Sequence, residues 1–445
     1  MSNSVGIISL GCAKNRVDAE LMMYQLVQAG FELKQDAAMA DAVIINTCGF
    51  IESAKQESIN EILELAELKK EGKIRAIIVT GCLAERYNSE VMKELSEVDA
   101  VIGIGKNADI AEVVRRALDG ERVECFPDKL QLPMDGGRVQ STEQHWAYLK
   151  IADGCDNCCT YCAIPLIRGR YRSRKMESIL EEAERLVRNG VKEINVIAQD
   201  TSRYGLDIYG ELKLAELLRR MCQIEGLRWI RVMYCYPDTI TDELLDTIRE
   251  EEKIVKYIDL PLQHCSGRIL RAMNRRGDKE SLLALIDRIR ERIPGVILRT
   301  TLIAGFPGET GEDFEELSEF VAQTRFERLG CFAYSQEEDT PAALLLDQID
   351  EDVKNRRAEL ITEQEALIIG EFCESVIGSE LDVLVDGFDR YADYWVGRSK
   401  YDAPEVDPVV FFTVGENKPR PGDIVRVRIT DRVDCDLTGE LISLS

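Results

Sequence analysis

Four cysteines stand within eight positions in the stretch GCDNCCTYCAIP, residues 154–165: Cys155, Cys158, Cys159 and Cys162. Two spacings overlap in this stretch. The four thiols can be divided into two C-x-x-C pairs, which is typical of a zinc site or a redox-active dithiol. Alternatively, Cys155, Cys159 and Cys162 form C-x-x-x-C-x-x-C and provide three thiolates, a ligand set suited to an iron–sulfur cluster.

The compactness of the stretch argues against zinc and against a dithiol. Zinc ribbons usually bring their ligands as two separated pairs, whereas here all four thiols lie in one tight loop, where closing a tetrahedral site is sterically awkward. A dithiol needs a thioredoxin-like setting, which the surrounding sequence does not predict. Three thiolates leave one iron of a 4Fe–4S cluster without a protein ligand, so that iron is open to a small cofactor.

Three more cysteines each follow a predicted strand near the N-terminus. The strands at 5–10, 42–45 and 74–79 lead into GCAKN with Cys12, TCGF with Cys48 and GCLAE with Cys82. In a parallel sheet the carboxyl ends of the strands share one edge, where ligands bind, and the glycine beside each cysteine lets the backbone turn closely around a bulky group. Three converging thiolates predict a second iron–sulfur cluster with an open iron; the alternative is three buried cysteines that share a register.

The remaining isolated cysteines are predicted to be small buried hydrophobic residues, as most cysteines outside metal sites are. They are Cys125, Cys222, Cys235, Cys265, Cys331, Cys373 and Cys435.

The elements that position these cysteines predict an α/β multidomain protein. Residues 1–135 alternate strands with helices at 18–29 and 51–69, with a weaker strand at 100–104, as expected of a doubly wound parallel α/β domain. Residues 136–144 are predicted to be a linker, at the end of a stretch from residue 125 that is rich in proline, glycine and polar residues. Residues 145–349 then contain six strand–helix units, fewer than the eight of a closed barrel, and so predict an open partial (β/α)6 barrel whose C-terminal mouth carries the four-cysteine loop.

The strands of these six units are expected at 147–152, 193–198, 229–235, 257–262, 296–304 and 329–334, and the helices between them at 178–189, 212–223, 242–251, 281–292 and 311–325. A charged amphipathic helix follows at 350–377, and short alternating runs separated by glycine and proline turns at 378–445 predict a small antiparallel β-barrel.

Composition indicates the cellular location of the protein and the charge of its binding partner. No apolar run is long enough to span a membrane and no signal peptide is recognisable, so we expect a cytoplasmic location without membrane attachment. In that reducing compartment the 14 cysteines favour metal binding or catalysis over disulfides. Lys and Arg number 56 and Asp and Glu 81, a net charge of −25, which favours a basic partner and disfavours nucleic acid.

The chain resembles the radical S-adenosylmethionine methylthiotransferases. The cluster loop after the first barrel strand matches the radical S-adenosylmethionine signature, in which Cys158 falls at a variable position and Tyr161 precedes the last cysteine. A three-cysteine N-terminal domain and a small C-terminal β-barrel, called TRAM, complete the resemblance. The family has a MiaB-like branch that modifies an adenosine of transfer RNA and a RimO-like branch that modifies an aspartate of small-subunit ribosomal protein twelve. The second branch is the one to which the sequence is similar at 9–20, 46–58, 154–174 and 260–277. The acidic C-terminal barrel agrees with a basic protein substrate.

The resemblance implies two 4Fe–4S clusters and S-adenosyl-L-methionine. Cys155, Cys159 and Cys162 would hold the catalytic cluster that cleaves S-adenosylmethionine to a radical, which would remove a hydrogen from the β-carbon of the aspartate. The cluster on Cys12, Cys48 and Cys82 would carry the sulfur that is methylated and transferred. A reductant protein such as flavodoxin or ferredoxin would supply electrons, and the ribosomal protein would be met free or within the assembled subunit.

Further residues at the predicted barrel mouth are cofactor-binding candidates. Tyr161 is expected to pack against the adenine, as in the family. Gln199 and Asp200 follow the second strand and could meet the ribose or methionine groups, unless Asp200 only caps a helix. Gln263 follows the fourth strand beside His264, which is more often structural, and Gly305 in GFPGE is expected at a close backbone approach. The basic run Arg168, Arg170, Arg172 and Arg174 is either a solvated loop or a pairing site for carboxylates.

Three hypotheses remain at this point: a ribosomal-protein methylthiotransferase, a transfer RNA methylthiotransferase, and a cysteine-rich scaffold that holds a structural metal without catalysing a reaction. The second would be favoured by a basic stripe on the folded C-terminal barrel, and the third by zinc binding without cleavage of S-adenosylmethionine.

Overall fold

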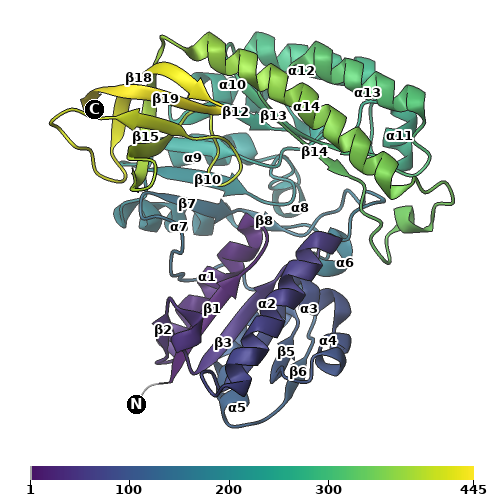
Figure 1. Ribbon diagram of the computed structural model, residues 1–445, viewed down its shortest axis with the longest axis vertical. Helices are drawn as coiled ribbons and strands as arrows, with labels where there is room; N and C mark the ends of the chain where they lie inside the picture. The colour runs from purple at the N-terminus through teal and green to yellow at the C-terminus, as the bar shows by residue number, and fades with distance from the viewer. Residues whose placement is uncertain (1–2, 445) are drawn as a thin grey trace.

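The computed structural model describes residues 3–444 and contains two parallel sheets and a closed β-barrel (Figure 1). The N-terminal sheet and its helices form one end of the molecule. The second sheet and the small barrel lie side by side at the other end. None of the helices in this described part of the chain combines the length and apolarity needed to cross a membrane.

The N-terminal sheet is parallel throughout, with strand order β2-β1-β3-β4-β5-β6. Its strands are β1 Ser4–Ser9, β2 Glu32–Lys34, β3 Ala42–Thr47, β4 Ala76–Gly81, β5 Ala100–Ile102 and β6 Val123–Cys125. The order reverses between β1 and β3, which is the point where doubly wound sheets bind their ligands. The sequence missed β2 and β6 because each is three residues long and contains charged side chains; Cys125, predicted to begin the linker region, ends β6.

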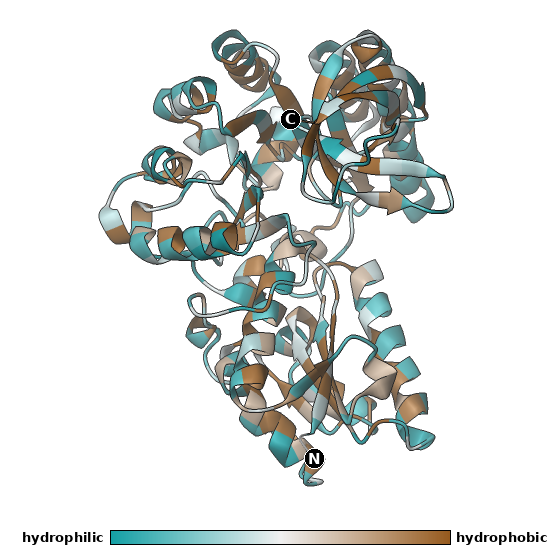
Figure 2. Ribbon diagram, turned by 90° about the vertical axis from the view of Figure 1, so that its left-hand side faces the viewer, coloured by the Kyte–Doolittle hydropathy of each residue, from teal (hydrophilic) through white to brown (hydrophobic). Residues whose placement is uncertain are grey.

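Helices cover both faces of this sheet because its central strands carry apolar side chains on both faces. Helices α1 Ala13–Gln28 and α5 Ile110–Leu118 pack on one face, and α2 Glu52–Lys70, α3 Cys82–Tyr87 and α4 Ser89–Glu94 pack on the other. Within β3, Ile44 belongs to the first of these cores, and Val43 and Ile45 to the second. Figure 2 shows the hydrophobic strands at the centre of this end of the molecule, flanked by the helices.

The second sheet is an open partial barrel of six parallel strands in the order β14-β13-β12-β11-β10-β7. The strands are β7 Trp146–Lys150, β10 Glu193–Ile197, β11 Trp229–Val232, β12 Ile254–Asp259, β13 Ile297–Ala304 and β14 Arg328–Ala333. Its outer helices are α7 Met176–Arg188, α9 Leu214–Cys222, α10 Asp242–Glu250, α12 Lys279–Arg292 and α13 Gly311–Thr324. The long helix α14 Glu351–Val376 then packs against β14 and α13. The expected (β/α)6 architecture is confirmed.

The C-terminal barrel is closed, with the order β15-β16-β17-β19-β18. Its strands are β15 Glu380–Asp389, β16 Tyr394–Ser399, β17 Val410–Thr413, β18 Ile424–Val433 and β19 Asp436–Leu444. Four of the pairings are antiparallel, as predicted, and β17 pairs with β19 in parallel.

The connection between β16 and β17 enters the concave side of the open barrel. Asp402 accepts a hydrogen bond from Arg328 at 2.6 Å, and Asp407 accepts one from the Tyr257 hydroxyl at 2.6 Å. Ala403 is fully buried and belongs to the same apolar cluster as Trp146 and Tyr257. The small barrel therefore packs against the N-terminal ends of the barrel strands, among them Glu193 of β10 and Arg328 of β14.

A short antiparallel pair closes the base of the cysteine-rich loop. Strand β8 Ala152–Asp153 pairs with β9 Arg172–Ser173, and helix α6 Ile164–Arg168 lies between them along the chain. Helix α6 contacts α3 of the N-terminal end. This contact brings the two cysteine-bearing regions together.

Candidate active site

Cys12, Cys48 and Cys82 stand at the carboxyl ends of three neighbouring strands, β1, β3 and β4, as the sequence predicted. Each thiol lies close enough to the others to influence their ionisation. Cys12 is accessible to solvent, whereas Cys48 and Cys82 are buried. The three thiols therefore share one edge of the sheet, at and beside the point where the strand order reverses.

Glycine makes this close approach possible. Gly11 has φ +84°, and a Cβ at this position would stand 2.8 Å from the Sγ of Cys48. Gly81 has φ +95°, and a Cβ there would stand 2.4 Å from the carbonyl oxygen of Thr47. At both positions the positive φ is unfavourable for a residue that has a Cβ, so glycine is the residue that fits without strain.

The three thiols differ in how readily they ionise. Crowding by protein atoms opposes ionisation of Cys12 even though its side chain is accessible, but Lys14 and Arg168 outweigh this and lower its pKa. Burial raises the pKa of Cys48, and it raises that of Cys82 to about 12 in spite of nearby Arg168. Of the three, Cys12 therefore has the surroundings that most favour the thiolate, the form in which cysteine binds metals.

Cys155, Cys159 and Cys162 lie in the loop between β8 and α6, and they too influence one another's ionisation. Burial raises the pKa of Cys155 to about 12 and raises that of Cys162 further. Cys158 is exposed and has φ +50°. That Cys158 is a spare, and not a ligand, stays a prediction.

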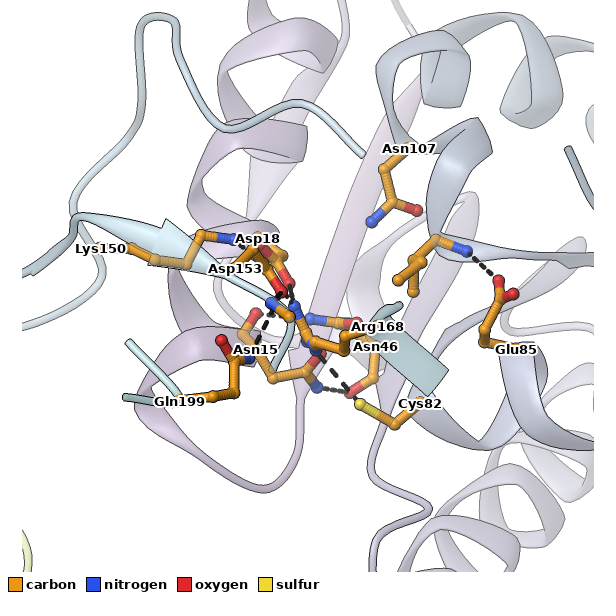
Figure 3. Close-up of polar contacts among 12 residues, drawn as sticks. Asn15, Asp18, Asn46, Cys82, Glu85, Asn107, Lys150, Asp153, Arg168 and Gln199 are labelled. Atoms are coloured by element: carbon orange, nitrogen blue, oxygen red, sulfur yellow. Dashed lines mark hydrogen bonds and ion pairs between the residues drawn. The ribbon is translucent and has the colours of Figure 1, made fainter. Parts of the chain in front are cut away.

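A buried charge network lies beside Cys82, between the two cysteine-bearing regions (Figure 3). Arg168 is 1% exposed, and its guanidinium donates to Asp18 at 2.7 Å, to Asp153 at 3.0 Å and to the Sγ of Cys82 at 3.7 Å. Lys150 pairs with the same two carboxylates.

The network reaches both ends of the molecule. Asp18 belongs to α1, next to the first cysteine set. Asp153 accepts a hydrogen bond from the backbone N–H of Gly154, which begins the cluster loop, at 2.8 Å. Burial alone would raise the pKa of Asp153, but Lys150 and Arg168 hold it well below its ordinary range. Cys82 also packs against Ala163, the residue that follows Cys162.

Arg275 is a candidate that the sequence did not single out. Its guanidinium donates to the Sγ of Cys159 at 3.7 Å and to the hydroxyl of Tyr161 at 3.4 Å, and it lies 4.4 Å from the centre of the Tyr236 ring. Tyr161 packs against the buried cluster that contains Phe306 and Tyr334. Arg275 belongs to the stretch 260–277, which supported the family resemblance. The residues next to Arg275 along the chain gave no signal of its contact with Cys159.

The predicted candidates after the second strand are both oriented toward the cluster loop. Asp200 accepts hydrogen bonds from the Asn157 amide at 3.0 Å, from the Ser202 hydroxyl at 2.8 Å and from the backbone N–H of Arg203 at 3.2 Å. Gln199 donates to Asp153 at 3.3 Å, and its buried carbonyl oxygen has no hydrogen-bond partner within the described chain. Asp200 thus both stabilises its own turn and holds the cluster loop, while Gln199 keeps a free acceptor.

The candidates after the fourth and fifth strands have structural partners. Gln263 adopts φ +74°, and its backbone bridges to β13. His264 is fully buried; its Nδ1 accepts from the N–H of Ser266, and its Nε2 lies 3.4 Å from Glu309. Gly305 has φ +77°, and a Cβ there would stand 2.2 Å from Lys354 of α14. The close approach expected at Gly305 is therefore to a helix, and the cofactor roles of Gln263 and Gly305 stay predictions.

The members of the basic run range from buried, through the half-buried Arg172, to exposed. Arg174 is 2% exposed and pairs with Asp135 and Glu182, and Arg168 lies in the network described above. Arg170 is exposed and 3.8 Å from Asp156, and Arg172 donates to the carbonyl of Leu130. Two of the four arginines are thus buried carboxylate partners within the protein, contrary to a wholly solvated loop.

The donor sets fit clusters better than single ions. Among residues 3–444, no three His, Cys, Asp or Glu side chains converge tightly enough to hold one metal ion. A 4Fe–4S cluster binds each cysteine to a different iron, so its ligands do not converge on a point. Three thiols with one arginine donor beside each set match that ligand pattern and the negative charge it carries.

Comparison with known protein families divides the chain into three matched segments. Residues 4–103 match a family described as uncharacterized protein family UPF0004, residues 149–321 match the radical SAM superfamily, and residues 377–442 match the TRAM domain. These segments cover most of the N-terminal sheet, most of the partial barrel and nearly all of the closed β-barrel.

Solved structures share the fold at low sequence identity. The chain resembles the radical S-adenosylmethionine methyltransferase TsrM from Kitasatospora setae with a TM-score of 0.59 and 15% identity, over 77% of each chain. It resembles the cobalamin-dependent S-adenosylmethionine radical enzyme OxsB with a TM-score of 0.51 and 12% identity, over 81% of this chain and 56% of that one. These likenesses support the arrangement of a parallel sheet beside an open barrel.

Curated relatives are similar over almost the whole chain. The protein named ribosomal protein uS12 methylthiotransferase RimO is 48% identical in Lachnoclostridium phytofermentans, over 97% of this chain and 98% of the relative. The protein of the same name in Clostridioides difficile is 46% identical, over 98% of each chain. With three matching domains and this identity, the chain belongs to the family of ribosomal protein uS12 methylthiotransferases named RimO.

Proposed function

We propose that this protein attaches a methylthio group to the β-carbon of an aspartate in ribosomal protein uS12, as a radical S-adenosylmethionine methylthiotransferase. The proposal is supported by full-length similarity to relatives of that name. The observation that carries it is the junction of the two three-cysteine sets, where Arg168 follows the barrel set along the chain and contacts Cys82 of the other set. A reaction that needs both a hydrogen abstraction and a sulfur transfer requires two such sites to face each other.

Two 4Fe–4S clusters and S-adenosylmethionine are the cofactors that fit these sites. When bound, they supply a one-electron route to an unactivated C–H bond and the sulfur to be transferred, chemistry that amino-acid side chains cannot provide. Cys155, Cys159 and Cys162 would hold the cluster of the barrel mouth, and Cys12, Cys48 and Cys82 that of the N-terminal sheet.

The chain itself orders and shields this junction. Asp200 and Asn157 hold the loop that carries the barrel thiols. The ring of Tyr161 extends the apolar wall formed by Phe306 and Tyr334, which excludes water from the side of the barrel mouth. The buried amide oxygen of Gln199 is available to accept a hydrogen bond from a ligand at the same mouth.

The charges of the C-terminal barrel support a basic protein as substrate rather than RNA. From Glu380 onward the chain has 14 acidic and 8 basic residues, a balance of −6. Three arginines of β18 are already paired with carboxylates: Arg426 with Asp382, Arg428 with Glu380 and Arg432 with Glu374. An RNA backbone would have to compete with these carboxylates for the same cations. A ribosomal protein substrate implies that the enzyme acts in the cytoplasm.

A substrate choice tests the proposal. Anaerobically reconstituted protein, sulfide, S-adenosylmethionine and a reductant such as reduced flavodoxin are offered ribosomal protein uS12, small ribosomal subunits and bulk transfer RNA in parallel. Mass spectrometry is expected to find the methylthio group on an aspartate of uS12. A methylthio group on adenosine would contradict the proposal and favour the transfer RNA reaction, and a zinc-loaded protein without cleavage of S-adenosylmethionine would favour a structural metal scaffold.

A further inference from the structure

Each cysteine set has its own buried arginine, and both make the same contact. Arg168 Nη2 lies 3.7 Å from the Sγ of Cys82, and Arg275 Nη1 lies 3.7 Å from the Sγ of Cys159. The two arginines are 1% and 7% exposed. A guanidinium is permanently charged, so each contact places a fixed cation against a sulfur that would bind iron.

The two cations differ in how far other charges cancel them. Arg168 donates to the carboxylates of Asp18 and Asp153, which also pair with Lys150. Two cations and two anions form a neutral group, visible as the crowded centre of Figure 3. Much of the field of Arg168 at Cys82 is therefore offset.

Arg275 lies among neutral groups. It donates to the backbone carbonyl of Pro261 at 2.6 Å and to the hydroxyl of Tyr161, and its guanidinium lies over the ring of Tyr236. Within residues 3–444 it makes no ion pair with a carboxylate. The sulfur of Cys159, which would be a thiolate once it binds iron, is thus the contact of Arg275 that would carry a negative charge.

This difference has a consequence for reduction. An added electron makes an iron–sulfur cluster more negative, and hydrogen bonds to its sulfurs together with nearby positive charge favour that reduced form. A cation without an opposing carboxylate favours it more than a cation inside a neutral group, because the carboxylates' fields cancel the cation's.

We propose that Arg275 is a positioning residue that raises the reduction potential of a cluster on Cys155, Cys159 and Cys162, and that Arg168 does so only weakly for a cluster on Cys12, Cys48 and Cys82. The inference rests on the proposed function, because it assumes that both sets hold 4Fe–4S clusters. Its effect is to direct the single electron from the reductant to the barrel cluster, where S-adenosylmethionine is cleaved, and away from the cluster that carries the sulfur.

Redox titration followed by electron paramagnetic resonance tests the proposal. The full-length protein is reconstituted anaerobically, its iron and sulfide are counted, and it is titrated with dithionite in the presence of mediators. Replacement of Cys12, Cys48 and Cys82 by alanine isolates the barrel signal, and replacement of Cys155, Cys159 and Cys162 isolates the N-terminal signal.

For the barrel cluster, Arg275→Gln is expected to lower the ratio of reduced to oxidised cluster about tenfold at a fixed potential, equivalent to about 59 mV for a one-electron couple. Arg275→Lys, which keeps the charge, is expected to recover most of the shift. Arg174→Gln is the matched control, since Arg174 is equally buried and pairs with two carboxylates but contacts Lys150 and not a cysteine. It is expected to leave both ratios unchanged.

For the N-terminal cluster, Asp18→Asn complements the removal of Arg168. Arg168→Gln leaves Asp18 and Asp153 with one cation and is prone to misfold, whereas Asp18→Asn keeps the arginine and removes one opposing charge. It is expected to raise the reduced fraction of the N-terminal cluster and leave the barrel cluster unchanged.

The outcomes separate the two levels of the argument. If the wild-type protein binds no iron through the six cysteines, the proposed function and this inference both fail, and the iron count shows this before any titration. If iron is bound but Arg275→Gln leaves the barrel potential unchanged, or Arg174→Gln shifts it equally, the inference alone is overturned.

Discussion

Gly11 and Cys48 lie just beyond the carboxyl ends of two neighbouring strands, β1 and β3, and the backbone of Gly11 passes so close to the Cys48 sulfur that a side chain at Gly11 would not fit. A Cβ at Gly11 would stand 2.8 Å from that Sγ, and Gly11 also has φ +84°. The glycine therefore lets β1 and β3 end close enough for Cys12 and Cys48 to serve one cluster.

Gly11→Ala is expected to remove the N-terminal cluster while the barrel cluster stays. The added methyl group displaces the Cys48 sulfur, so iron content should fall by about half, from two 4Fe–4S clusters toward one. Gly30→Ala is the matched control, because Gly30 has φ +87° but no atom within 4 Å of the added Cβ. It should cost only about 1 kcal/mol of backbone strain and keep full iron; an equal loss of iron in both variants would show that φ strain, and not the Cys48 contact, is responsible.

The four-cysteine loop makes a separate prediction about which thiols bind iron. Cys159→Ala is expected to abolish cleavage of S-adenosylmethionine, because it removes one of the three proposed ligands of the barrel cluster. Cys159 is buried beside Arg275. Cys158→Ala is expected to leave iron content and cleavage within about twofold of wild type, because Cys158 is exposed and is not one of the three proposed cluster ligands. Release of 5′-deoxyadenosine, measured by chromatography, checks both; loss of barrel iron in Cys158→Ala would refute the assignment of the ligands.

Loss of a cysteine from the N-terminal set is expected to affect methylthio transfer and not the cleavage of S-adenosylmethionine. Cys82→Ala is expected to abolish methylthio transfer while cleavage of S-adenosylmethionine continues, because the barrel cysteines are unchanged. Mass spectrometry of uS12 and chromatography of the same reaction give both readings at once. A Cys82→Ala variant that still transferred the group would place the sulfur elsewhere.

The sequence predicted most of the framework, because the signals there are local. Cys12, Cys48 and Cys82 could be placed at one edge since each follows an apolar strand next to glycine. Arg275 could not be found, because it meets Cys159 across 116 positions of the chain. The role of Gly305 was equally hidden, since its constraint comes from Lys354 on the later helix α14.

Glu365 of α14 makes stability depend on pH. Its side chain is 6% exposed, both carboxyl oxygens lack hydrogen-bond partners in the described chain, and burial raises its pKa to about 8 even though Arg328 is nearby. The folded state therefore keeps the proton that the unfolded state releases near pH 4.5, so the stabilisation is complete below that pH and is lost as pH rises through about 8.

Glu365→Gln, which is neutral at every pH, is expected to remove this dependence. Between pH 5 and pH 9 the wild type should lose roughly 4 kcal/mol more of its free energy of unfolding than the variant does. Thermal unfolding measured across that range checks this. Glu363→Gln on the exposed face of the same helix is the control, and its pH profile should match the wild type; a wild type and Glu365→Gln with parallel profiles would contradict the buried-acid explanation.

Asp200 and Asn157 offer a test of whether a predicted cofactor contact works through the cluster loop. Asp200 holds the Asn157 amide at 3.0 Å and uses its other oxygen for its own turn. If its role is to position the loop, Asp200→Asn and Asn157→Ala break the same link, so the double variant should be no worse than the poorer single one. We expect each to slow cleavage of S-adenosylmethionine about tenfold, with a coupling energy near 1.4 kcal/mol between them. Fully additive losses, with a weakened dissociation constant for S-adenosylmethionine in Asp200→Asn alone, would instead assign Asp200 a direct contact with the cofactor.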